Sequence, residues 1–314
     1  MFGELPELFN RNFAIGYYLP VTVFVVINAV YADVYGIMPG LLDFTNTSQV
    51  NVLVGTTILA LISWLLSIIL LGVNRELTRM LEGYGKFNPL RLFLKLQLTA
   101  YDKCLKKIDE LDNQYREYLK NECEIPGEFI TKRNQAMWEM VERFPSRRNL
   151  VLPTSFGNTL RAFEIYSLDM YGIDAIPGWS RLIAVISKEY KEYIDDTKVF
   201  VDFWMNTFYL NIFLLIEYLI LTTIFDKYRL WLLPILFALA IFTSYGRACK
   251  VAIHWGNTVK AAFDVYLPDL WEKMGFIIPE GKEEKKKLWI SFNQAVIYGR
   301  PDIMPDRKKL EKDM

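Results

Sequence analysis

Four long apolar runs constrain the fold of this chain more than any other feature. They cover residues 13–32, 52–73, 199–225 and 230–245, and the second contains no charged residue. About 20 apolar residues in a helix cross a hydrocarbon layer of about 30 Å. The fourth run is shorter, but it can be extended to Cys249. A buried core helix is the alternative for a single run, and the uncharged second run argues against it, so we expect four transmembrane helices.

Basic residues between the runs predict the orientation of the chain. Residues 33–51 contain no Lys or Arg, whereas both ends of the region 74–198 carry several. Cytoplasmic flanks of membrane spans carry an excess of Lys and Arg, so we expect the central region and both termini in the cytosol. The chain is then a multi-pass protein of the cell's inner (plasma) membrane. Its expected parts are a cytosolic N-terminus (1–12), a transmembrane hairpin (13–73), a cytosolic helical domain (74–198), a second hairpin (199–250), and a cytosolic C-terminal helix with a charged tail (251–314).

The spacing of apolar residues predicts helices throughout the cytosolic region, which makes the whole fold all-α. Residues 90–122 lack Gly and Pro and form one long amphipathic helix, and Pro126-Gly127 begins a second that ends near residue 144. A helix capped at residue 154 or 155 runs to 170, where Gly172 ends it. A turn at Pro177-Gly178 then leads into a single helix of about 70 Å that becomes the third span. The fourth span continues inward until Pro268, and the tail holds one short helix over 288–298.

Polar side chains inside the spans are the main candidates for function. Glu217 lies well inside the third run, where an ionisable group costs about 3 kcal/mol or more and usually faces a bundle interior or water. Other polar residues share its helical face, and a second stripe of small and polar residues follows the second span. Such stripes are typical of helix packing or of a narrow pore. The candidates for a pore or polar path are Asp202, Asn206, Tyr209, Glu217, Thr56, Ser63, Ser67 and Asn74.

Two further groups of residues have both a structural and a functional interpretation. Arg247, Lys250 and His254 follow the fourth span beside Trp255, where they either anchor the helix end or bind an anion or a lipid headgroup. The segment 152–182 carries a mixed-charge set whose ion pairs would fix the angle between two helices. Its two arginines could instead bind a phosphate or nucleotide. This coupling corner, through which a cytosolic event would reach the third span, consists of Arg161, Asp169, Asp174, Trp179 and Arg181.

Several classes of function are not indicated by the sequence. There is one histidine, and the three cysteines contain no C-x-x-C pair, so no metal site and no cofactor is expected. None of the common nucleotide-binding, hydrolase or metalloprotease motifs is present, so no catalytic residue is assigned and an enzyme is not expected. Lys plus Arg equals Asp plus Glu at 36 each, so the chain has no net positive charge to attract nucleic acid.

One segment carries a resemblance to known proteins. A G-N-x-L-R-A pattern at residues 157–162 is followed by Y-G-x-D-A at 171–175 and by Trp179. This run resembles a segment of an uncharacterised family of prokaryotic multi-pass membrane proteins, which implies a prokaryotic origin and brings no known activity. The order of two spans, a cytosolic helical block, two spans and a tail is similar to bestrophin-type anion channels in layout alone.

Two functions remain open at this point. The first is a homo-oligomeric ion channel or pore in membrane lipid, gated or tuned by its cytosolic helices. The alternative is a non-conducting membrane anchor or sensor that docks a soluble cytosolic protein partner, for example in bacterial signalling or defence. Self-association is expected because a lone set of four helices with polar stripes would bury them best in a closed ring.

Overall fold

The computed structural model describes residues 10–38, 49–225 and 232–306, and every regular element longer than a single bridge in these residues is a helix. Four of the helices are long and apolar enough to cross a membrane: Arg11–Val34, Val52–Glu82, Lys188–Phe225 and Leu233–Met274. The prediction of an all-helical chain with four apolar helices is therefore confirmed for the described part of the chain.

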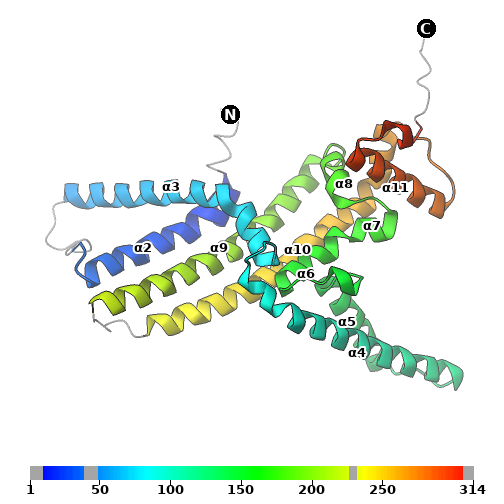
Figure 1. Cartoon of the computed structure of the whole chain (residues 1–314), viewed down its shortest axis with the longest axis horizontal. Helices are drawn as coiled ribbons and strands as arrows, with labels where there is room; N and C mark the ends of the chain where they lie inside the picture. Colours follow the sequence, from blue (N-terminus) through cyan, green and yellow to red (C-terminus); the bar gives the residue numbers. More distant parts are fainter. Residues whose placement is uncertain (1–9, 39–48, 226–231, 307–314) are drawn as a thin grey trace, which may run out of the picture. The chain divides into compact units, whose positions relative to one another are not determined.

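The chain divides into two compact units. The first unit contains residues 1–79 and 195–251, and the second contains residues 80–194 and 252–314. The helices of the first unit are α1 (Arg11–Phe13), the π-helical segment η2 (Ala14–Tyr18), α2 (Leu19–Val34) and most of α3 (Gln49–Glu82), α9 (Lys188–Phe225) and the first part of α10 (Leu233–Met274). Figure 1 shows the long helices of this unit running alongside one another.

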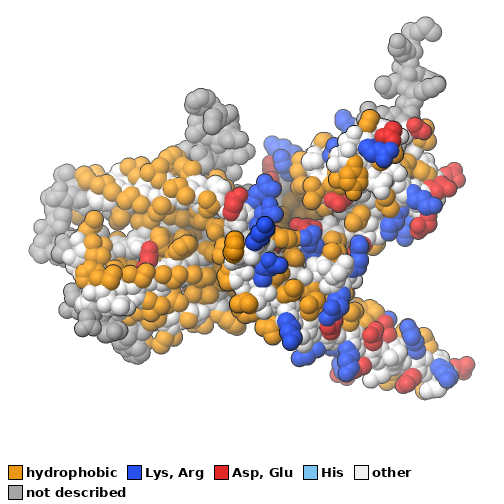
Figure 2. All heavy atoms as spheres, viewed as in Figure 1, with side chains coloured by type: hydrophobic (Ala, Val, Ile, Leu, Met, Phe, Trp, Pro, Cys, Tyr) orange, Lys and Arg blue, Asp and Glu red, His pale blue; other side chains and the backbone are white. Residues whose placement is uncertain are grey.

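Apolar and aromatic side chains form the core of the first unit. In one cluster, Phe13, Tyr17 and Val21 pack with Leu70 of α3. In a second, tyrosines of α2 pack with Leu214 of α9, while the outward-facing side chains of the long helices are also apolar, as Figure 2 shows. Contiguous exposed apolar surface of this kind marks a face that another molecule or a lipid phase covers.

The second unit is built from shorter helices. They are η3 (Pro89–Phe93), α4 (Leu94–Lys120), α5 (Gly127–Arg143), η4 (Arg148–Leu150), α6 (Ser155–Glu164), α7 (Tyr166–Tyr171), α8 (Ala175–Leu182), α11 (Lys282–Tyr298) and η5 (Pro301–Ile303). The ends of α3, α9 and α10 complete it. α4 and α5 pair around Tyr101, Met140 and Phe144. α4 is the long amphipathic helix that was expected after the second apolar run.

The segment 152–182 differs from its prediction. The Thr154 hydroxyl caps α6 by accepting from the Gly157 amide at 2.9 Å, and Gly172 ends α7 at φ 83°, both as expected. The single helix expected between them breaks at Ile165. Pro177-Gly178 does not form a turn but lies near the start of α8. Proline is tolerated there because the first amide groups of a helix have no hydrogen-bond acceptor within the helix.

The continuous helix from Trp179 into the third span is also wrong. α8 ends at Leu182, and α9 begins at Lys188 after Ser187, whose hydroxyl accepts from the Tyr190 amide at 3.2 Å. This Ser187 cap starts a new helix where a run without Gly or Pro gave no sign of an interruption. Further along, α10 continues past Pro268 to Met274, and α11 begins at Lys282 rather than at residue 288.

Candidate functional site

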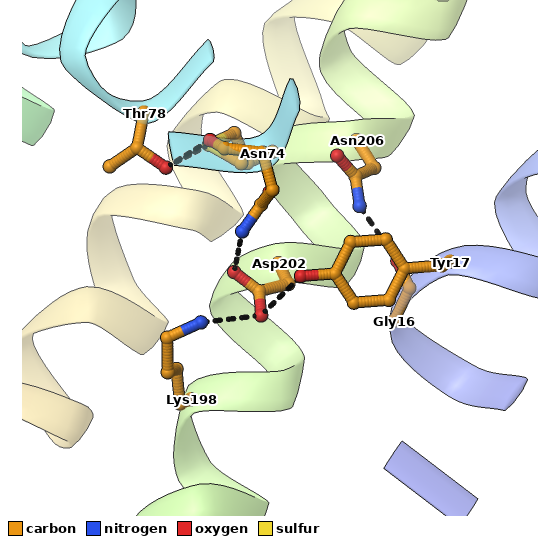
Figure 3. Close-up of polar contacts among 8 residues, drawn as sticks. Gly16, Tyr17, Asn74, Thr78, Lys198, Asp202 and Asn206 are labelled. Carbon is orange, nitrogen blue, oxygen red and sulfur yellow. Dashed lines mark hydrogen bonds and ion pairs between the residues drawn. The ribbon is translucent and has the colours of Figure 1, made fainter. Parts of the chain in front are cut away.

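A buried carboxylate lies among the apolar helices of the first unit. Asp202 of α9 is 6% exposed, and its two oxygens accept three hydrogen bonds. The donors are the Tyr17 hydroxyl at 3.0 Å, the Asn74 side-chain amide at 3.1 Å and the Lys198 ammonium at 2.7 Å (Figure 3). The segments η2, α3 and α9 therefore meet at this carboxyl group, and we call it and its three partners the Asp202 cluster.

The partners of Asp202 explain how a charge is tolerated there. Burying an isolated carboxylate is costly unless it is paired and hydrogen-bonded. Lys198 precedes Asp202 by one helical turn, the spacing at which two side chains on a helix meet, and it supplies the compensating charge. The Lys198 side chain itself is 42% exposed, so part of it stays accessible while its ammonium contacts Asp202.

Asn206 extends the cluster by one helical turn. Its side-chain amide donates to the Gly16 carbonyl at 2.9 Å, inside the π-helical segment η2. Single π turns within α-helices are frequent at functional sites because they shift backbone groups out of the regular ladder. Here the shifted segment brings Gly16 and Tyr17 to adjacent positions on α9, as Figure 3 shows.

Two amide oxygens of the cluster are buried without a hydrogen-bond donor among the described residues. They are Oδ1 of Asn74 and Oδ1 of Asn206. Both amide orientations are fixed by chemistry, because the nitrogen of each side chain faces an oxygen acceptor. Water or an ion can satisfy buried oxygens of this kind.

The polar stripe predicted for the third span lies inside the first unit. Tyr209 follows Asn206 by about one helical turn, and its hydroxyl donates to the Leu77 carbonyl of α3 at 2.8 Å. Asp202, Asn206 and Tyr209 therefore face η2 and α3 together. Sequence reasoning placed Asn74 on a separate stripe, and the structure brings it to Asp202.

Glu217 lies apart from this cluster. It follows Asp202 by 15 residues, which is about 22 Å along a helix. Its side chain is half-buried, with Asn28 of α2 within hydrogen-bonding reach of the carboxyl group. The oxygen Oε2 is buried without a hydrogen-bond partner among the described residues. α9 thus carries two separate polar positions inside its apolar length.

The stripe predicted on the second span divides between two environments. Ser63 and Ser67 are buried, and their hydroxyls donate to carbonyls of their own helix, those of Leu59 at 2.8 Å and of Ser63 at 2.6 Å. Thr56 is exposed on the outer side of α3. The two serines therefore pack within the unit, as small residues commonly do between helices in membranes.

The three residues predicted to anchor the fourth span or to bind a headgroup are all exposed. Arg247, Lys250 and His254 follow one another along α10, and the imidazole ring of His254 lies edge-on to Tyr193 with centroids 6.4 Å apart. Their exposure fits both the anchoring and the headgroup-binding interpretation.

The charges of the coupling corner are bonded locally, and the two arginines do not converge on one ligand. Arg161 pairs with Glu164 in its own helix at 3.3 Å and donates to the Tyr84 hydroxyl, whereas Arg181 donates to the Pro177 carbonyl at 2.7 Å. Nothing in this geometry builds the phosphate site considered above.

The remaining corner residues also have structural partners. Asp169 pairs with Arg147 at 2.9 Å, a partner that the sequence did not indicate. Asp174 caps α8 by accepting from the Ile176 amide at 2.9 Å, and Trp179 packs against Phe263.

A cavity of about 400 Å³ lies in the second unit, lined by parts of α7, α10 and α11. Asp264, one of two acidic residues that line it, accepts from the hydroxyls of Tyr166 at 2.9 Å and Tyr171 at 2.7 Å. Burial, followed by the contact with Asp264, raises the pKa of Tyr166 to about 12. Lys286 on the same wall donates to the Asp169 carbonyl at 2.6 Å. Asp264 is thus occupied by the two tyrosine hydroxyls and Lys286 by a backbone carbonyl, which indicates a structural role for these groups.

The described residues contain no group of three or more His, Cys, Asp or Glu side chains that could hold a metal ion. Searches of protein-family models, curated proteins and solved structures find no significant match to this chain. The resemblance of residues 157–179 to prokaryotic membrane proteins therefore stays a prediction, and the function is inferred from the residues themselves.

Proposed function

We propose that the chain is a subunit of a homo-oligomeric membrane channel, with the first unit in the bilayer and the second unit gating or tuning it. The Asp202 cluster is the observation that carries this proposal. Ionisable groups within membrane helices are expensive and mark ion or substrate paths more often than they serve packing alone. Asp202 and Glu217 give α9 two such groups about 22 Å apart, a separation comparable to most of a hydrocarbon layer.

The chemistry of the polar atoms favours a cation. Asp202 and Glu217 are carboxylates, and the unpartnered oxygens of Asn74 and Asn206 can only accept or coordinate. Rings or rows of carboxylate and carbonyl oxygens select cations in channels. The expected ion is therefore opposite in sign to that of the anion channels whose layout the chain resembles.

Lys198 acts in this proposal as a tethered cation. Its ammonium lies 2.7 Å from Asp202, where a permeating cation would bind, and the two would compete for one carboxylate. Because the lysine side chain is long and partly exposed, it can leave this position without crossing the core. Displacement of Lys198 would then open the site to ions.

Self-association is supported by the outer side of α3. This helix is the least buried of the four apolar helices. Thr56 and Ala60 lie on its exposed side one turn apart. Small residues at this spacing let two membrane helices approach closely, and a closed ring forms when this face meets a different face of the next identical subunit.

Ion flux in proteoliposomes tests the proposal. Wild-type protein is expected to release trapped K⁺, Lys198→Met is expected to release it at least threefold faster, and Asp202→Asn more slowly. Asn211→Ala is the matched control, because Asn211 lies on the same helix and, within the described part of the chain, donates only to the Thr207 carbonyl of that helix, at 2.7 Å. Equal rates for wild-type, Asp202→Asn and empty liposomes would refute a channel.

A membrane anchor that docks a soluble partner is the second candidate, and one surface of the second unit favours it. Trp138 and Val141 lie three residues apart on α5 and are 65% and 53% exposed. Large aromatic residues exposed in this way are typical centres of protein interfaces. Co-purification of a stoichiometric soluble protein that is lost with Trp138→Ser, together with an absence of ion flux, would establish this alternative.

A further inference from the structure

Large apolar side chains are exposed along the connection between α3 and α4. Phe87, Leu92 and Leu96 are 98%, 84% and 63% exposed, and all six residues from 91 to 96 have exposed side chains. Isolated exposed apolar residues are ordinary, but a contiguous set marks a surface that another molecule or phase covers. We call residues 83–96 the connecting platform.

The connecting platform is held in a defined conformation. The Asn88 side chain donates to the carbonyls of Met80 at 2.6 Å and Tyr84 at 2.8 Å, and accepts from the Leu90 amide at 2.9 Å. Gly83 has φ 97°, and a Cβ atom there would lie 2.7 Å from the Pro153 ring. The bend at residue 83 therefore requires glycine, and the three hydrogen bonds of Asn88 fix the turn that leaves Phe87 exposed.

The charge of the connecting platform is of one sign. Lys86, Arg91 and Lys95 are exposed between the apolar side chains, and no Asp or Glu occurs from residue 83 to residue 101. Short segments that combine basic residues with Phe and Leu lie in the interface of a bilayer, with the apolar side chains below the headgroups. Anionic headgroups attract each basic residue near the surface.

The chain length keeps the connecting platform close to the end of a membrane span. The apolar helix Val52–Glu82 has 31 residues, hence a length of about 46 Å, against about 40–45 Å for a bilayer with its headgroups. Phe87 follows Glu82 by five residues, which reach at most about 18 Å. A helix that crosses the bilayer therefore delivers Phe87 near the headgroup layer.

We propose that the connecting platform binds the anionic lipid surface of the bilayer, inserting Phe87 and Leu92 between headgroups that Lys86, Arg91 and Lys95 contact. The inference rests on the proposed insertion of α3 in a membrane and is independent of ion conduction. Its functional meaning is regulatory: lipid charge holds the start of α4 at the surface, so the second unit senses the composition of the membrane.

Site-specific fluorescence tests this proposal in the full-length protein. In a background with Cys104, Cys123 and Cys249 changed to Ser, single cysteines at positions 58, 87 and 176 each carry an environment-sensitive dye. Each protein is placed in nanodiscs of phosphatidylcholine alone or with phosphatidylglycerol, and quenching by lipids bearing a nitroxide near the headgroup or in the acyl chain is measured. Position 58 reports insertion of α3. Ile176, which is 87% exposed, is the matched control on the second unit.

The expected result is quenching at position 87 that exceeds quenching at position 176 at least threefold in anionic nanodiscs and decreases in neutral ones. Changing Lys86, Arg91 and Lys95 together to Gln is expected to remove the difference between the two lipids. Quenching at 58 without quenching at 87, or equal quenching at 87 and 176, overturns the proposal while leaving membrane insertion intact. Absence of quenching at 58 overturns insertion and this inference together.

Discussion

Truncation of the central carboxylate, Asp202→Ala, is expected to destabilise the first unit. It leaves the hydroxyl of Tyr17, which is 5% exposed, and the amide nitrogen of Asn74 without their acceptor. A buried donor left unpaired costs about 1–3 kcal/mol, whereas hydrogen bonds between membrane helices average about 0.6 kcal/mol and reach about 1.7 kcal/mol. Lys198 can turn toward water and adds little. The expected loss is therefore about 1–4 kcal/mol.

Equilibrium unfolding in mixed detergent micelles, followed by tryptophan fluorescence, measures this loss. Asn211→Ala serves as the control, because it removes a side-chain amide that bonds only to its own helix, and a change below about 0.5 kcal/mol is expected. The double variant Tyr17→Phe with Asp202→Ala should lose less stability than the sum of the two single variants. The Tyr17 hydroxyl, which Asp202→Ala leaves without an acceptor, is then absent. Strict additivity, or a loss no larger than that of Asn211→Ala, would contradict the geometry of the cluster.

Two further predictions concern the second unit. Gly157→Ala should destabilise it by about 1–3 kcal/mol, because the new Cβ would lie 2.6 Å from the Glu82 carbonyl oxygen. Gly127→Ala is the control, because a Cβ there has nothing within 4 Å and should have no steric cost. Equal losses of thermal stability in the two variants would count against the packing of α6 on α3. The pKa of Tyr166, raised to about 12 by burial and by Asp264, makes stability fall as pH rises from about 10 to about 12. Tyr166→Phe should lose this dependence in part when unfolding is measured across that range, and an unchanged pH profile would refute it.

The length of the apolar runs was sufficient to predict the four long helices, because a run of about 20 apolar residues leaves few alternatives. Local hydrogen-bonding signals also worked: Thr154 caps α6, and Gly172 ends α7 in the left-handed region. The break between α8 and α9 was missed because residues 183–187 contain neither Gly nor Pro. The local signal was Ser187, whose hydroxyl caps α9.

The candidate site could be predicted only in part. Asp202, Asn206 and Tyr209 were placed on one helical face by their spacing, and Lys198 stands one turn before Asp202. Tyr17 and Gly16 were not found, because their approach to α9 depends on the π-helical segment η2 and spans more than 180 residues of sequence. Periodicity locates a residue on its own helix and contains no information about which other helix lies opposite.

The reversal potential of wild-type protein in a planar bilayer tests the central claim most directly. With a tenfold KCl gradient across the bilayer, the proposal predicts a conductance whose reversal potential lies near the K⁺ equilibrium potential, and Asp202→Asn should shift this potential toward zero. A reversal potential near that of Cl⁻, or a bilayer with inserted oligomers and no conductance, would contradict a cation path through the Asp202 cluster.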